Sequence, residues 1–284
     1  MSGVIRQKPD WLKKKIHLQE TYELYKLFGT LNLHTVCKEA LCPNISECFS
    51  KKIATFLIMG CTCTRNCDFC AVKNGMPDKI DKSEPQRVAE AVIKLGLKHV
   101  VITSVTRDDI NDGGAEIFAK TIAALKAVDK ELKVEVLVPD FKASASSIKK
   151  VIQANPDIFA HNLETVPRLY SKVRQDAQYE RSLEVLAKAK SFSKNIYTKS
   201  GLMLGLGETE KEVLDVLADL RQVGCDFLSL GQYLTPSKNH YQVHDFIHPD
   251  KFIYYKNKAR EFGFLHTQSG PYVRSSYVAH EYLS

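Results

Sequence analysis

Short apolar runs alternate with amphipathic segments from residue 54 onward. Six of these runs are rich in β-branched and apolar residues and are bounded by loop residues, a pattern that predicts strands. They are Ala54–Met59, His99–Ser104, Val134–Val138, Ile158–Asn162, Tyr197–Leu204 and Phe227–Gln232. Between them, apolar residues recur three and four positions apart, as on one face of a helix. Strands that alternate with helices indicate a parallel sheet.

The segment between the first two runs shows clear helix signals. Val88, Ala91, Val92 and Leu95 fall on one helical face, and Gly96 follows directly, where a glycine commonly ends a helix. Six strand–helix units are fewer than the eight of a complete barrel. We therefore expect an α/β fold, a partial (β/α)6 TIM-type barrel with N- and C-terminal extensions; a doubly wound sheet is the alternative. In either fold the chemistry belongs at the carboxyl ends of the strands.

Residues outside the repeating pattern form the two expected extensions. Leu18–Leu33 has helical periodicity and leads into a cysteine-rich loop. After residue 233 the pattern weakens to one helix over Asp250–Phe262 and an irregular tail. The predicted domains are an N-terminal extension over 1–53, the partial barrel over 54–250, and a C-terminal helix and tail over 251–284.

Composition and charge exclude several classes of protein. The 284 residues are 44% hydrophobic and 26% charged, the balance of a soluble globular protein. No apolar run approaches the roughly 20 residues that span a bilayer, and no apolar segment follows the basic N-terminus as a signal peptide requires. We expect a cytoplasmic location, or an organellar matrix if a presequence has been removed. The net charge of +7 indicates a lysine-rich solvated surface or an acidic protein partner; no nucleic-acid or membrane partner is expected.

Cysteines carry the most information about function. Seven of the eight lie between positions 37 and 70, and an odd cluster without a secretion signal favours metal over disulfides. Cys63, Cys67 and Cys70 have the spacing C-x3-C-x2-C. Three thiolates can hold three irons of a cubane cluster and leave the fourth iron open to a small ligand. A structural zinc site is the alternative, although zinc usually takes four ligands.

A second group of three cysteines precedes the first. Cys37, Cys42 and Cys48 have the spacing C-x4-C-x5-C and again no local fourth cysteine. Three free thiols close together are open to oxidation, so a second cluster is favoured over buried structural cysteines.

The later group, with Phe69 just before its last cysteine, resembles the signature of the radical S-adenosylmethionine (SAM) superfamily. The stretch SGLMLGLGE resembles the superfamily's fifth-strand segment, which lies against the adenine of SAM. The resemblance implies that the open iron of a [4Fe–4S] cluster chelates SAM. An electron from the cluster then cleaves SAM to a 5′-deoxyadenosyl radical. The expected SAM contacts are Phe69, Ser104, Asn162, Glu164 and Met203.

The order of the two cysteine motifs, C-x4-C-x5-C just before C-x3-C-x2-C, resembles the lipoyl synthase family. Blocks similar to the family's continue over nearly the whole chain, among them TSVTRDDINDGGA, HNLETVPRLY and LGQYLTPS. RSSY, at residues 274–277, resembles the family's C-terminal motif, whose serine binds the auxiliary cluster. The resemblance implies two [4Fe–4S] clusters. By this resemblance Ser276 is the expected serine ligand of the auxiliary cluster, with Ser275 as the alternative. The other expected ligands are Cys37, Cys42 and Cys48 for the auxiliary cluster and Cys63, Cys67 and Cys70 for the radical cluster.

Three residues depart from the family's pattern. Cys61 and Cys225 belong to no family motif and are expected to bind no iron. Phe49 stands where the family leads us to expect a tryptophan, a conservative aromatic change.

The resemblance also implies a reaction. Radicals remove hydrogens from carbons 6 and 8 of an octanoyl chain that is amide-linked to a lysine, and sulfur from the auxiliary cluster is inserted at both carbons. No side chain need act as general acid or base, so no catalytic residue is expected beyond the clusters. The implied partners are an octanoylated lipoyl carrier protein or domain, an electron donor such as flavodoxin or ferredoxin, and an iron–sulfur cluster carrier. We expect a monomer.

Three other functions compete with this interpretation. A biotin-synthase-like enzyme would hold its second cluster by ligands scattered over several strands, where this chain has no cysteine apart from the region of Cys225. A tRNA-methylthiolating enzyme would add a C-terminal RNA-binding domain. A non-catalytic zinc or iron scaffold would bind metal without sulfide.

Overall fold

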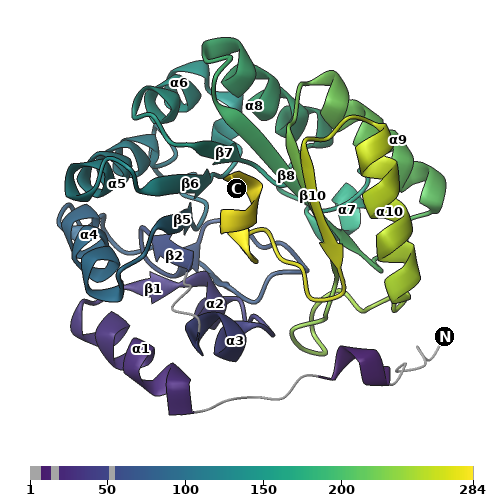
Figure 1. Ribbon diagram of the computed structural model, residues 1–284, viewed down its shortest axis with the longest axis horizontal. Helices are drawn as coiled ribbons and strands as arrows, with labels where there is room; N and C mark the ends of the chain where they lie inside the picture. Colours follow the sequence, from purple (N-terminus) through teal and green to yellow (C-terminus); the bar gives the residue numbers. More distant parts are fainter. Residues whose placement is uncertain (1–7, 14–18, 51–54, 284) are drawn as a thin grey trace.

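The computed structural model describes residues 8–13, 19–50 and 55–283. A curved sheet of eight strands forms its centre (Figure 1). In spatial order the strands are β1 (His34–Thr35), β2 (Thr55–Ile58), β5 (His99–Ser104), β6 (Lys133–Leu137), β7 (Ile158–Ala160), β8 (Tyr197–Leu204), β9 (Phe227–Gln232) and β10 (His266–Gly270). A separate short pair, β3 (Thr62–Cys63) and β4 (Lys73–Asn74), lies in the loop after β2.

Helices cover the outer face of this arc of strands (Figure 1). They are α4 (Glu84–Leu95), α5 (Ala115–Val128), α6 (Ala145–Gln153), α8 (Tyr179–Phe192), α9 (Glu210–Gln222) and α10 (Pro249–Glu261). The remaining helical segments lie before β2, in the loops and in the C-terminal tail. They are α1 (Gln19–Thr30), α2 (Val36–Glu39), α3 (Ile45–Ser50), α7 (Tyr170–Val173), and the 3-10 turns η1 (Asp10–Leu12), η2 (Phe141–Ala143), η3 (Pro167–Leu169) and η4 (Ala279–Leu283). Within the described residues, no helix has the length and apolar character needed to cross a membrane.

Strand pairing confirms the predicted partial barrel. Every pairing from β2 to β10 is parallel, and β1 alone runs antiparallel to its neighbour β2. Within the described part of the chain, β1 and β10 end the sheet and do not pair with each other. The barrel is therefore open, and its parallel strands, from β2 to β10, present their carboxyl ends on one side.

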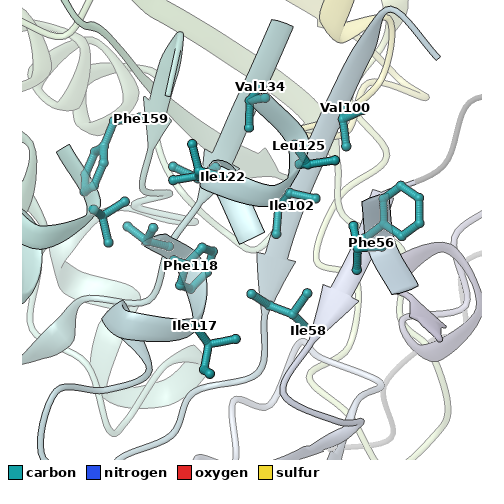
Figure 2. Close-up of a cluster of buried hydrophobic side chains, with 14 of the residues drawn as sticks. Phe56, Ile58, Val100, Ile102, Ile117, Phe118, Ile122, Leu125, Val134 and Phe159 are labelled. Atoms are coloured by element: carbon teal, nitrogen blue, oxygen red, sulfur yellow. The ribbon is translucent and has the colours of Figure 1, made fainter. Parts of the chain in front are cut away.

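An apolar core fills the space between the strands and the outer helices. Figure 2 shows Phe56 and Ile58 of β2 and Ile102 of β5 in one cluster with Phe118 and Ile122 of α5, and all five side chains are fully buried. Phe118 and Ile122 are four residues apart, so they lie on the same face of α5. Each such buried side chain stabilises the fold by about 2 kcal/mol.

All six predicted strands are present, with ends that differ from the prediction by at most a few residues. The first predicted strand began at Ala54, which lies outside the described residues, as does Leu18, the predicted start of the N-terminal helix. Gly96 ends α4 in a left-handed conformation (φ 64°), as the sequence predicted. The proposed division at residues 53 and 250 stays a prediction.

The expectation of an irregular tail directly after the last helix is wrong for residues 266–270. Residues His266–Gly270 form β10, which pairs in parallel with β9 over all five residues. Its sequence, HTQSG, lacks the apolar run that marks the other strands, because β10 lies at an edge of the sheet and most of its side chains are only partly buried. Backbone pairing with β9, rather than local hydrophobicity, makes this segment a strand.

Candidate active site

A cavity of about 540 Å³ lies at the carboxyl ends of the strands. Segments from the N-terminal region, the loop after β2, the strand ends and the C-terminal tail all line it. Every predicted site residue lies on its wall: Cys37, Cys42, Cys48, Cys63, Cys67, Phe69, Cys70, Ser104, Asn162, Glu164, Met203 and Ser276. The fold thus brings together residues that are up to 239 positions apart in the sequence.

Cys63, Cys67 and Cys70 are held by a short loop that begins at β3. Backbone N–H groups of Arg65 and Thr106 donate to the Cys63 sulfur at 3.4 and 3.3 Å, as a thiolate ligand requires. Burial and the neighbouring thiols raise the pKa of Cys67 to about 12 and that of Cys70 to about 11. A bound cation would be needed to hold both sulfurs as thiolates at neutral pH. Three cysteines of one loop on one cavity wall are the donors that an iron cluster with one open iron takes.

Arg65, between the first two cysteines of this loop, fixes the loop to the barrel. Its guanidinium donates to Asp108 at 2.7 and 3.0 Å and to Asp140 at 2.9 and 2.8 Å. Burial alone would raise the pKa of Asp140, but the hydrogen bonds and charge of Arg65 hold it well below its usual value. The loop is thereby tied to the segments that follow β5 and β6. Sequence reasoning missed this role; the only signal was an arginine inside the cysteine motif.

Cys37, Cys42 and Cys48 form the second group, on α2, α3 and the turn between them. The backbone N–H of Cys42 donates to the Cys37 carbonyl oxygen at 3.0 Å, which closes the turn. Burial, followed by the proximity of Cys42 and Cys48, raises the pKa of Cys37 to about 12. Within the described residues, no three His, Cys, Asp or Glu side chains gather around one point as a single metal ion needs. A cubane cluster does not need such convergence, because each thiolate binds a different iron.

The two serines of RSSY face different parts of the cavity. Thr55 donates from its hydroxyl to Ser276 Oγ at 2.7 Å and from its backbone N–H to the Cys37 sulfur. Ser276 therefore shares a hydrogen-bonding neighbour with the second cysteine group. Ser275 Oγ instead accepts from Asn162 Nδ2 at 2.5 Å, at the end of β7.

Polar groups at the strand ends have hydrogen-bonding capacity that a ligand could use. Ser104 Oγ and Asn162 Oδ1 are buried and have no hydrogen-bond partner within the described part of the chain. Asn162 Nδ2 also donates to Glu164 Oε1 at 3.0 Å. Buried polar atoms are normally paired, so these orphaned oxygens on a cavity wall fit a polar ligand such as SAM.

Two further features of this wall belong to the same part of the site. Arg174 donates to the Asn162 carbonyl oxygen at 2.9 Å and lines the cavity; the sequence did not single it out as a site residue. At Gly201 a Cβ would lie 2.6 Å from Ser229 Oγ and 3.0 Å from Asn162 Oδ1. A side chain at position 201 would therefore displace the polar groups that face the cavity.

Comparison with known proteins gives close relatives over the full length. Residues 57–220 match the family model described as the radical SAM superfamily. A protein named lipoyl synthase from Caldicellulosiruptor saccharolyticus is 58% identical and covers 97% of each chain. Another protein of that name, from Geotalea uraniireducens, is 54% identical and covers 98% of each chain.

Solved structures with low identity share the fold. Streptococcus suis SuiB bound to its precursor peptide SuiA has a TM-score of 0.60 at 10% identity, over 99% of this chain and 60% of SuiB. Methylornithine synthase, PylB, has a TM-score of 0.52 at 16% identity, over 67% of this chain and 56% of PylB. This chain thus spans less than two thirds of either structure, and at 10% and 16% identity the likeness concerns the fold alone.

Proposed function

Because this chain belongs to the lipoyl synthase family of the radical SAM superfamily, we propose that its cavity is where two sulfur atoms are inserted at carbons 6 and 8 of a protein-bound octanoyl chain. One observation carries this assignment: a single cavity is lined by both cysteine groups and by the RSSY motif. One acyl chain can therefore reach both groups without leaving the protein.

When bound, two [4Fe–4S] clusters and SAM supply the hydrogen-abstracting radical and the inserted sulfur. Cys63, Cys67 and Cys70 hold three irons of one cluster and leave the fourth for SAM. The Arg65 clamp keeps this loop at the barrel mouth. The N–H groups directed at Cys63 stabilise negative charge on its sulfur.

Ser104, Asn162, Glu164 and Arg174 face the space beside this first group and hold the polar parts of SAM, while Phe69 and Met203 supply apolar contact. Burial raises the pKa of Glu164, and the nearby positive charge of Arg174 opposes that rise. Arg174 therefore favours the carboxylate form, which accepts hydrogen bonds from a ligand. No side chain of this wall has to move a proton during hydrogen abstraction.

Cys37, Cys42, Cys48 and Ser276 hold the auxiliary cluster. Thr55 supports this set, because it donates to both Cys37 and Ser276. A serine alkoxide is an unusual iron ligand that can be protonated and released, which suits a cluster that gives up its sulfur. In this proposal the N-terminal extension supplies three ligands and the C-terminal tail the fourth.

A lipoyl synthase requires an octanoylated substrate and a reductant. For this chain, the proposed partners are a lipoyl carrier protein or domain, flavodoxin or ferredoxin as the electron donor, and a cluster carrier that restores the auxiliary cluster. A cytoplasmic location and a monomeric state belong to the same proposal.

The ligand assignment is tested best with the auxiliary cluster in isolation. A chain with Cys63, Cys67 and Cys70 replaced by alanine, reconstituted with iron and sulfide, should hold about four irons. Adding Ser276→Ala should open one iron, so the electron paramagnetic resonance (EPR) spectrum of the reduced cluster should shift when cyanide is added. Ser275→Ala and Cys61→Ala are the matched controls and should leave the spectrum insensitive to cyanide. A cyanide-sensitive spectrum with Ser275→Ala, but not with Ser276→Ala, would reverse the assignment.

A further inference from the structure

A buried ion pair inside the barrel includes none of the proposed cluster ligands or SAM contacts. Lys199 of β8 and Glu135 of β6 are both fully buried, and Lys199 Nζ donates to the two carboxylate oxygens at 2.9 and 3.2 Å. The pair bridges over β7, the strand between them. His99 Nε2 lies 3.8 Å from the same carboxylate. No step described above uses these groups.

Two further partners of Lys199 come from the C-terminal tail. Its Nζ donates to the carbonyl oxygen of Ser275 at 2.6 Å and lies 3.9 Å from the centre of the Tyr282 ring. Tyr282 belongs to η4, which lies within the arc of strands in Figure 1, and its hydroxyl donates to the Leu228 carbonyl oxygen at 3.2 Å. The ammonium group thus joins the barrel wall to the tail at two points.

Stability alone does not explain this arrangement. Transfer of a lysine and a glutamate into the interior is costly, and apolar residues of similar volume often stabilise a fold equally well. A buried charge does offer directed hydrogen bonds, and here one of them ends on the peptide group between Ser275 and Ser276. That peptide sets the direction of both serine side chains, because it fixes the backbone from which they project.

We propose that Lys199, held by Glu135, is a positioning residue that anchors the tail so that Ser276 faces the cysteines of the second group. The inference rests on the proposed function, in which Ser276 binds the auxiliary cluster. The other tail contacts agree with it: Thr55 donates to Ser276, and Tyr277 donates to Glu47 Oε1 at 2.9 Å on α3, the helix that carries Cys48. Lys199 thus holds the backbone of the tail at Ser275, while Thr55 and Glu47 contact the side chains of the next two residues.

The test separates positioning from stability by replacing both charges at once. Lys199→Met alone would leave the buried Glu135 carboxylate without its lysine partner and with only His99 nearby, so that chain is expected to fold poorly. Lys199→Met with Glu135→Leu removes both charges of this pair and should fold, yet it lacks the hydrogen bond to Ser275. Lys211→Met with Asp215→Leu removes an exposed ion pair on α9 and is the matched control.

Two measurements report whether the tail is held in place. In the full-length protein without iron, the Lys199/Glu135 double variant should lose the tail's protection from carboxypeptidase, whereas the control should keep it. In the chain with Cys63, Cys67 and Cys70 replaced by alanine, the double variant should make the EPR spectrum of the reduced auxiliary cluster sensitive to cyanide, as Ser276→Ala does.

Full tail protection together with a cyanide-insensitive spectrum in the double variant would overturn the proposal. If the alanine-substituted chain holds no second cluster even with Lys199 and Glu135 intact, the proposed function fails instead. The carboxypeptidase result still decides in that case whether Lys199 anchors the tail.

Discussion

Arg65 offers the sharpest test of how the cysteine loop is held. Arg65→Met removes four hydrogen bonds to Asp108 and Asp140 and leaves the fully buried Asp140 carboxylate without its main partner. Loss of one partner of a buried pair costs about 3–5 kcal/mol. Arg181 Nε remains 3.1 Å from Asp140, and the backbone N–H of Lys142 still donates to it, so the low end, about 3 kcal/mol, is expected.

Urea denaturation of the protein without iron measures this loss, and thermal melting should show a decrease in Tm of about 6 °C. Arg168→Met is the matched control, because Arg168 donates to both carboxylate oxygens of Glu212 but is 53% exposed. An exposed pair of this kind is worth less than about 1 kcal/mol. Equal losses in the two variants would refute the reasoning, because burial would then not matter. Reconstituted Arg65→Met should also hold less iron in the radical cluster than the control.

Two further predictions concern the tail and the pH dependence of stability. Gly231→Ala would place a Cβ against the carbonyl oxygen of Val273, so the tail should shift and lose its protection from carboxypeptidase, whereas Gly29→Ala, in open space, should have no such effect. Burial and the charge of Arg174 lower the pKa of His161 to about 4, whereas an unfolded histidine titrates near pH 6.5. The unfolded state therefore binds a proton that the folded state excludes, and about 3 kcal/mol of stability should be lost as pH falls from 6.5 to 4. His161→Asn should abolish this part of the loss in urea titrations at the two pH values, and an unchanged pH dependence would contradict the assignment.

The sequence predicted most of the fold because six strands are short segments, rich in β-branched and apolar residues, that are bounded by loop residues. It missed β10 because a polar edge strand is defined by its neighbour β9 and not by its own residues. The cysteine groups were found because the proposed cysteine ligands of each cluster are close in the sequence, where their spacing is visible.

Ion-pair partners that are far apart in the sequence were not predicted. Lys199 and Glu135 are 64 residues apart, and Arg65 and Asp140 are 75 residues apart, so only the folded barrel brings them together. The sequence also could not separate Ser275 from Ser276, because adjacent residues differ only in direction. The structure supplies that direction through Asn162 on one side and Thr55 on the other.

One measurement tests the central claim most directly. The protein is reconstituted anaerobically with iron and sulfide and incubated with reductant, SAM and an octanoyl-lysine peptide, and the peptide is then analysed by mass spectrometry. The account predicts release of 5′-deoxyadenosine and a peptide mass increased by two sulfur atoms, less two hydrogens once the dithiol oxidises to the cyclic disulfide. Release of 5′-deoxyadenosine with an unchanged peptide mass would contradict it, because radicals would then form without sulfur insertion into the octanoyl chain.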